Sequence, residues 1–131
     1  MKHSHNTGMV YRLFAVAAFI FLTESLWAQD PVKVDSVHHT VVFENDDVRV
    51  IRVQFGPQEK GVMHEHPNSV VIFLTDFVGR FTFPDGKTVD RTGKAGQAIW
   101  APAVKHQFDN IGDKPLEGIQ VELKPRKAKT E

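Results

Sequence analysis

Apolar and polar side chains alternate along much of this chain with a period of two residues, which is typical of β-strands that bury one face. Residues 118–123 alternate most cleanly, and the pattern predicts that their three aliphatic side chains face the core while Gln120 and Glu122 face solvent. In residues 48–55 the alternation slips in the middle of the segment. Such a slip predicts either a β-bulge or a strand that is buried on both faces.

Several further short segments have the same character, and turn signals separate them about every 8–12 residues. Among these signals, the Asp85-Gly86 pair lies between two strand-like runs and is typical of a β-hairpin. No segment after residue 28 has the 3.6-residue apolar period of a helix. We therefore expect a single all-β domain, a sandwich or a barrel. Its predicted strands are residues 41–43, 48–55, 70–74, 81–83, 88–91, 97–101, 106–110 and 118–123.

The first 28 residues differ from the rest and have the three parts of a secretory signal peptide. Lys2 and Arg12 supply the basic start, residues 13–22 are all apolar, and Ala28 offers a small residue for cleavage. The apolar run is shorter than the roughly 20 residues that span a bilayer, although an uncleaved anchor is the alternative. We expect export to the periplasm or the medium, with no membrane anchor after cleavage. The predicted divisions are a signal peptide (1–28), a lead-in segment (29–40), the barrel (41–124) and a polar C-terminal tail (125–131).

Charge and composition narrow the classes of partner and of chemistry. Lys plus Arg equals Asp plus Glu at 16 each, so nothing favours a nucleic acid or an anionic membrane as a partner. The chain has no cysteine, which excludes disulfides, thiolate metal ligands and a cysteine nucleophile.

Histidines are the candidate functional residues. His64 and His66 are separated by one residue in an extended stretch, so their side chains point to the same face, as ligands of one metal ion require. His106 follows another strand-like run, and we expect it to join them. His38 and His39 are adjacent, so they face opposite ways and cannot both serve one site, and we expect them to lie at the surface.

With these residues the sequence resembles the cupin superfamily, whose members are small jelly-roll β-barrels with two conserved motifs on either side of a hairpin. The resemblance covers about residues 41–123 and is greatest to short bacterial cupins, some of which are labelled β-alanine degradation proteins. It implies a single-domain cupin-type jelly-roll β-barrel. In the first motif the matching residues are His64, His66 and, one residue from its usual place, Gly79; in the second they are Gly96, Pro102, His106 and Asn110.

The main departure from the cupin pattern is its glutamate ligand, which would fall at Val70 or Val71. Three interpretations stay open: three histidines hold the metal alone, another side chain supplies the fourth ligand, or the site has lost its metal. Imidazole ligands suit Fe, Mn, Cu, Ni or Zn without choosing among them. The candidates for a fourth ligand are Gln97, Asn68 and Glu65.

Two functions follow from the resemblance. One is a metal-dependent oxygenase, a dioxygenase-like enzyme acting on a small organic substrate; the other is a module that binds a small ligand or a metal without turnover. A homodimer that pairs through an edge strand, at residues 41–43 or 119–123, is a further expectation. The side chains expected to line the pocket are Met63, Phe73, Phe81, Trp100 and Phe108.

Overall fold

The computed structural model describes residues 29–126. The predicted signal peptide lies outside this range and stays a prediction. Among the described residues, no helix has the length and apolar character needed to cross a membrane. The elements in chain order are α1 (Pro31–Val34), β1 (His39–Glu44), β2 (Val48–Phe55), β3 (His64–His66), β4 (Ser69–Phe73), β5 (Phe77–Thr82), β6 (Thr88–Gly93), β7 (Ala98–Ala101), β8 (Val104–Asn110) and β9 (Leu116–Leu123).

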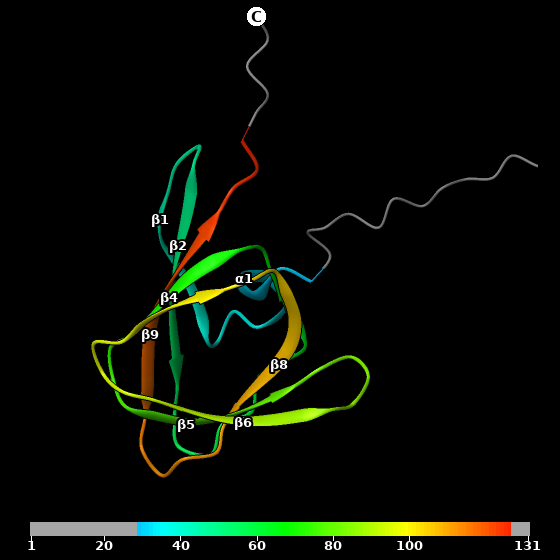
Figure 1. The fold of residues 1–131 in the computed structure, drawn as a ribbon, viewed down its shortest axis with the longest axis vertical. Helices are drawn as coiled ribbons and strands as arrows, with labels where there is room; N and C mark the ends of the chain where they lie inside the picture. The colour runs from blue at the N-terminus through cyan, green and yellow to red at the C-terminus, as the bar shows by residue number, and fades with distance from the viewer. Residues whose placement is uncertain (1–28, 127–131) are drawn as a thin grey trace, which may run out of the picture.

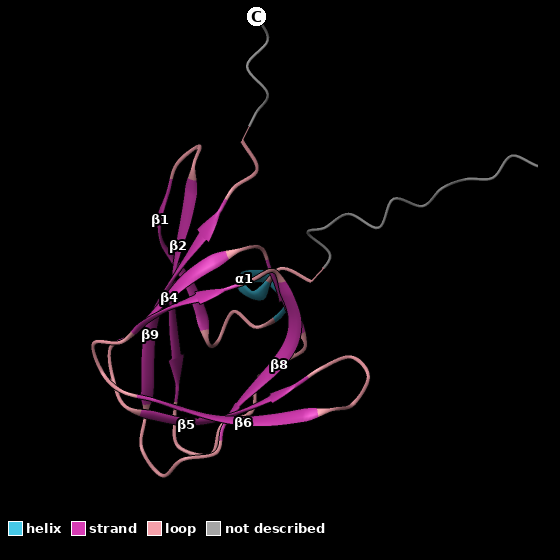
Figure 2. Cartoon of the chain, viewed as in Figure 1, coloured by secondary structure: helices cyan, strands magenta, loops and turns pink. Residues whose placement is uncertain are grey.

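The strands form two antiparallel sheets that face each other, as the sequence predicts for an all-β domain (Figures 1 and 2). The larger sheet has the order β1-β2-β9-β4-β7, and the smaller one has the order β3-β8-β5-β6. Strand β9 is the middle strand of the larger sheet, paired to β2 and β4 along its length. It therefore has no free edge, and the prediction that residues 119–123 could pair with another copy through an edge is wrong.

Strand β9 also faces the opposite way from the prediction. Gln120 and Glu122 are buried, at 7% and 2% exposure, whereas Leu123 is 39% exposed. The polar side chains tolerate burial because each has a partner inside. The Gln120 amide donates to the hydroxyl of Ser69, and the Glu122 carboxylate accepts from Arg49. Alternation fixes which residues share a face, but it does not say which face is buried.

Between the sheets lies an aromatic core built from Phe55, Phe77, Phe108 and Leu116. The phenyl ring of Phe108 packs directly against the backbone of Gly79, where a Cβ would lie 2.2 Å from a ring carbon. This contact gives a physical reason for the glycine at that position, because any side chain would displace the ring.

The segment predicted to be an irregular lead-in, residues 29–40, contains a short helix and the start of β1, and it packs against the sheets. Helix α1 is capped by the side chain of Asp30, which accepts from the backbone N–H of Val32 at 2.9 Å. The helix contacts β1 and β3, and the Gln29 carbonyl accepts from the backbone N–H of Glu65 at 2.9 Å. The segment thus lies directly against the strand that carries the His-x-His pair.

Candidate metal centre

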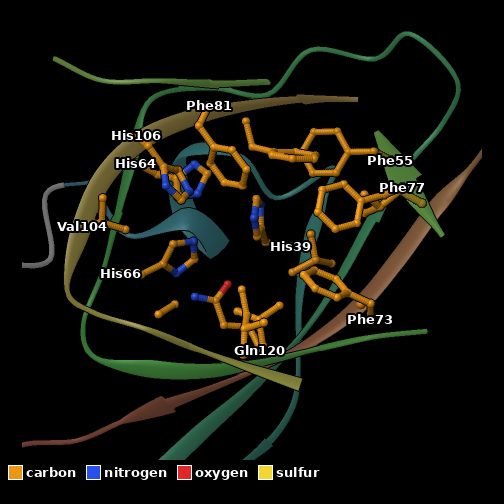
Figure 3. A pocket seen from close by; sticks show the side chains of 17 residues that line it. His39, Phe55, His64, His66, Phe73, Phe77, Phe81, Val104, His106 and Gln120 are labelled. Carbon is orange, nitrogen blue, oxygen red and sulfur yellow. The ribbon is translucent and has the colours of Figure 1, made fainter. Parts of the chain in front are cut away.

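The three histidines that the sequence singles out lie together on the smaller sheet. His64 and His66 occupy alternate positions of β3 and are almost fully buried, at 1% and 5% exposure. His106 on β8 is the direct cross-strand partner of His64. Its ring centroid lies 5.0 Å from that of His64 and 5.5 Å from that of His66. Figure 3 shows the imidazoles around one end of a cavity.

A fourth imidazole, that of His39, completes the cluster from β1. It is 3% exposed, and its ring centroid lies 4.7 Å from that of His64. The prediction that His38 and His39 lie at the surface is therefore wrong. His38 is also buried, stacked on the Phe55 ring at 3.9 Å and bonded to the Asp35 carboxylate at 2.6 Å. His38 lies in the turn before β1 and contacts Asp35 and Phe55, as His39 also does, but only His39 lines the cavity.

Three of these histidines lie close enough together to hold a metal ion. One ring nitrogen from each of His39, His64 and His66 lies within 4.8 Å of those of the other two. The Nδ1 atom of His64 lies 2.6 Å from the Val62 carbonyl, and that of His39 lies 3.1 Å from the Asp35 carbonyl. Because a carbonyl only accepts hydrogen bonds, these Nδ1 atoms carry the proton and each Nε2 keeps its lone pair.

The Nε2 atom of His64 is buried with no hydrogen-bond partner among the described residues. An unpaired buried polar atom costs about 1–3 kcal/mol, so a native structure usually gives it a partner. A metal ion would supply that partner, because the neutral Nε2 lone pair is the form of histidine that binds metals.

Burial keeps the cluster in this neutral form. It lowers the pKa of His39 from 6.5 to about 4 and, with the nearby charge of His64, that of His66 to about 3. The pKa of His106 is lowered to about 3, mainly by burial and then by electrostatic repulsion from the other three histidines. The pKa of His64 is also lowered by burial. The imidazoles therefore need not lose a proton at neutral pH before they bind a metal.

His66 is hydrogen-bonded to a buried network of three charged side chains, those of Glu122, Arg49 and Asp30. Its Nδ1 atom lies 2.7 Å from Oε1 of Glu122, and the other Glu122 oxygen accepts from Arg49 at 2.6 and 2.7 Å. Arg49 also donates to Asp30 at 2.7 Å. Burial opposes the charge on Arg49, but these bonds raise its pKa. Burial raises the pKa of Glu122, and Arg49 opposes that rise. A carboxylate behind a histidine ligand fixes its ring orientation and raises its basicity.

The imidazoles close one end of an apolar cavity of about 130 Å³. Gln120 is the one polar side chain among the lining residues besides the four histidines. Figure 3 shows its amide directed toward the space between His66 and His39. The other lining residues are Val53, Phe55, Val71, Phe73, Phe77, Phe81, Ile99, Ala101, Val104, Phe108, Leu116 and Gly118.

Of the five side chains predicted to line this pocket, Phe73, Phe81 and Phe108 do so. Met63 and Trp100 do not. Met63 adjoins His64, so alternation along the strand turns it away from the cavity. Trp100 is 56% exposed, because β7 presents its neighbour Ile99 to the cavity instead.

The fourth-ligand candidates lie elsewhere. Gln97 is exposed and accepts from the Lys94 backbone. Asn68 accepts from the Ala103 backbone, and Glu65 faces Lys105 at 3.8 Å. These predictions are wrong. Gln120 lies opposite Val71 in the β4–β9 register, beside one of the two positions where the cupin motif would place its glutamate. Only the strand pairing identifies it, because β9 lies far along the chain.

Comparisons with known proteins identify relatives of the fold. No family model matches the sequence, and no curated protein matches it. A cupin domain from Bordetella pertussis Tohama I is 26% identical with a TM-score of 0.62, over 66% of this chain and 92% of that one. An RmlC-like cupin with a double-stranded β-helix fold, from Methanocaldococcus jannaschii, is 16% identical with a TM-score of 0.52, over 65% and 77% of the two chains.

Proposed function

We infer that the chain is a cupin, because it shares the fold of a cupin domain that is 26% identical to it, and we propose that it binds a divalent transition metal through the Nε2 atoms of His39, His64 and His66. The observation that carries this proposal is the buried, unpaired Nε2 of His64 within a set whose Nδ1 atoms are held from outside. Fe, Mn, Cu, Ni and Zn all suit imidazole ligands. Such an ion, when bound, supplies a Lewis acid with positions open to a ligand.

His106 lies beside this set rather than within it. Its ring is close to those of His64 and His66, but its nitrogens fall outside the group that shares the 4.8 Å spacing. We assign it a place beside the ligand set, next to Phe81, whose ring centroid lies 5.1 Å away. The ligand set that the sequence favours, with His106 in place of His39, is the alternative that mutation distinguishes.

The cavity defines the kind of molecule that would reach the ion. Its walls are phenyl and aliphatic, and its volume of about 130 Å³ is close to that of a cavity that holds benzene, about 150 Å³. The proposed ligand is therefore a small organic molecule with an apolar body. One polar end would face the histidines and the Gln120 amide.

The test is metal binding by single alanine variants of His39, His64 and His66, followed by calorimetry and by elemental analysis. We expect one equivalent of metal in the wild type and a loss of metal affinity of more than about a hundredfold in each variant. Substitution of a residue that only hydrogen-bonds to a ligand typically lowers metal affinity by about 10–100-fold. His38→Gln is the matched control, because it changes a buried histidine outside the set. A wild type that binds no added ion would refute the proposal.

The same titration separates the two ligand sets. With His39 as a ligand, His106→Ala loses less affinity than His39→Ala. The reverse order would assign the site to His64, His66 and His106, and equal losses would show four histidine ligands.

Catalysis is a second candidate function, favoured by the direct opening of an apolar cavity onto the histidines. No carboxylate lines this cavity among the described residues, so an oxygenase reaction here would depend on the ion. We expect the iron-loaded protein to consume dioxygen with a benzene-sized substrate, measured with an oxygen electrode, and His64→Ala to abolish the uptake. Metal binding without uptake, across a panel of such substrates and ions, would leave a non-catalytic binding module.

A further inference from the structure

A row of apolar side chains crosses the outer face of the larger sheet. The strand registers place Phe43 opposite Val50, Val50 opposite Val121, Val121 opposite Val70, and Val70 opposite Trp100. Directly paired residues share a face. Along their strands, the neighbours of four of these residues line the cavity or are buried; the four are Val50, Val121, Val70 and Trp100. The row therefore runs over all five strands on the side away from the metal centre.

Both ends of this row are exposed despite their aromatic side chains, and the valines between them are half-buried. Trp100 is 56% exposed and Phe43 is 53% exposed. A second row, with Ile119, Ile72 and Ala98, runs beside the first. The slip of alternation in residues 48–55 has the same origin, because β2 carries valines on this face and buried side chains on the other. Apolar patches of this extent usually mark an interaction site.

We propose that this face binds a second copy of the chain, sheet against sheet, in a two-fold symmetric dimer. The row has an aromatic residue at each end and valines between them, so a copy turned about a two-fold axis along β9 places aromatic against aromatic and valine against valine. Isologous interfaces require such self-complementarity, and stacked sheets pack about 10 Å apart with their strands aligned to within about 30°.

Size and charge also favour a second copy. Five strands about 4.8 Å apart, with up to three side chains about 6.8 Å apart along each, give a face of roughly 24 by 20 Å. A flat face of that size covers about 480 Å², and the relief of its side chains raises the accessible area toward the roughly 800 Å² that each partner buries in a standard interface. The charged side chain in the second row, Arg52, is paired with Glu117 at 3.1 Å. The face thus offers little to a charged partner.

The experiment compares the association of the purified wild-type chain with that of Trp100→Arg and Val121→Arg, by sedimentation at micromolar concentrations. We expect a wild-type dimer and at least about a tenfold weaker association in each variant, which corresponds to about 1.4 kcal/mol. Val78→Arg is the matched control, since Val78 is 43% exposed on β5 of the other sheet and should leave the dimer intact. Far-UV circular dichroism confirms that each variant is folded. Trp100 is largely exposed, so its replacement should leave the fold intact.

Fluorescence distinguishes other occupants of the face. In a Trp27→Phe background, Trp100 is the only tryptophan of the chain. We expect its emission to shift to the blue as the protein concentration rises, because association buries it. A monomer with an exposed Trp100 would overturn the proposal. A monomer with a protected Trp100 would overturn it too, and would assign the face to another part of the same chain, such as the apolar residues 13–22.

Discussion

Acidification of the metal-free protein is expected to lower its free energy of unfolding as the pH falls below 6.5. The cause is the group of buried histidines, which stay neutral in the folded state because burial lowers the pKa of His39 to about 4 and that of His66 and His106 to about 3. In the unfolded chain the same side chains regain a pKa near 6.5. Between these values the unfolded state binds more protons, and protons therefore favour it.

Acid lowers the stability because the pKa of these histidines is lower in the folded state than in the unfolded state. The contribution of the histidines to stability is fully present above pH 6.5 and is lost progressively toward pH 4. Each histidine that takes up its proton only on unfolding contributes about 1.4 kcal/mol per pH unit in this window. Glu122 acts in the opposite direction, because a raised pKa lets the folded state bind a proton more readily just above 4.5. Several histidines oppose this single carboxyl, so destabilisation prevails.

Urea unfolding at a series of pH values, in the presence of a chelator, measures the effect. The matched variant is His106→Gln, which removes one titrating group and should reduce the slope of unfolding free energy against pH by about 1.4 kcal/mol per pH unit. If the wild type were equally stable at pH 7 and pH 5, the histidines would already be charged or solvated in the folded state. That result would contradict the buried, neutral cluster.

The sequence was sufficient for those parts of the site that depend on local spacing. The His-x-His pair must share a face of β3, and His106 lies at the start of a strand-like run, so the sequence predicts that these three histidines converge, as they do in the structure. The aromatic lining was predicted in part for the same reason, since the phenylalanines of β4, β5 and β8 point inward from strands that could be recognised.

Other parts of the site depend on strand pairing, which the sequence does not show. Gln120 and Glu122 look like the solvent side of an alternating strand, and only their buried partners Ser69 and Arg49 reverse that interpretation. The place of His39 in the site depends on the pairing of β1 with β2, because this pairing sets His39 opposite Val53, a residue of the cavity wall. A buried polar side chain is stabilised by distant partners, so a local pattern cannot identify it.

The second large effect is expected at Glu122, the residue that joins His66 to Arg49. Glu122→Ala leaves the guanidinium of Arg49 buried at 8% exposure and still paired with Asp30, but it removes the two bonds from Arg49 to Glu122 and the carboxylate partner of His66 Nδ1. A hydrogen bond to a charged group contributes about 1.5–3 kcal/mol, so losing the bonds from both Arg49 and His66 costs about 3–6 kcal/mol. We expect the free energy of unfolding, measured by urea denaturation at neutral pH, to fall by about that amount. The control is Asp90→Ala, which breaks the exposed pair with Arg80 and should leave the stability nearly unchanged.

The milder variant Glu122→Gln separates the structural role of this residue from its role toward the metal. An amide keeps the shape of the side chain, and its oxygen still accepts a hydrogen bond from His66 Nδ1. The substitution removes the negative charge that makes the imidazole a stronger ligand. A loss of metal affinity of about 10–100-fold, with most of the stability retained, is the expected result. If Glu122→Gln bound metal as tightly as the wild type, the carboxylate would serve only to hold Arg49. The buried network from Asp30 to His66 would then be a structural feature of the barrel and not part of its metal centre.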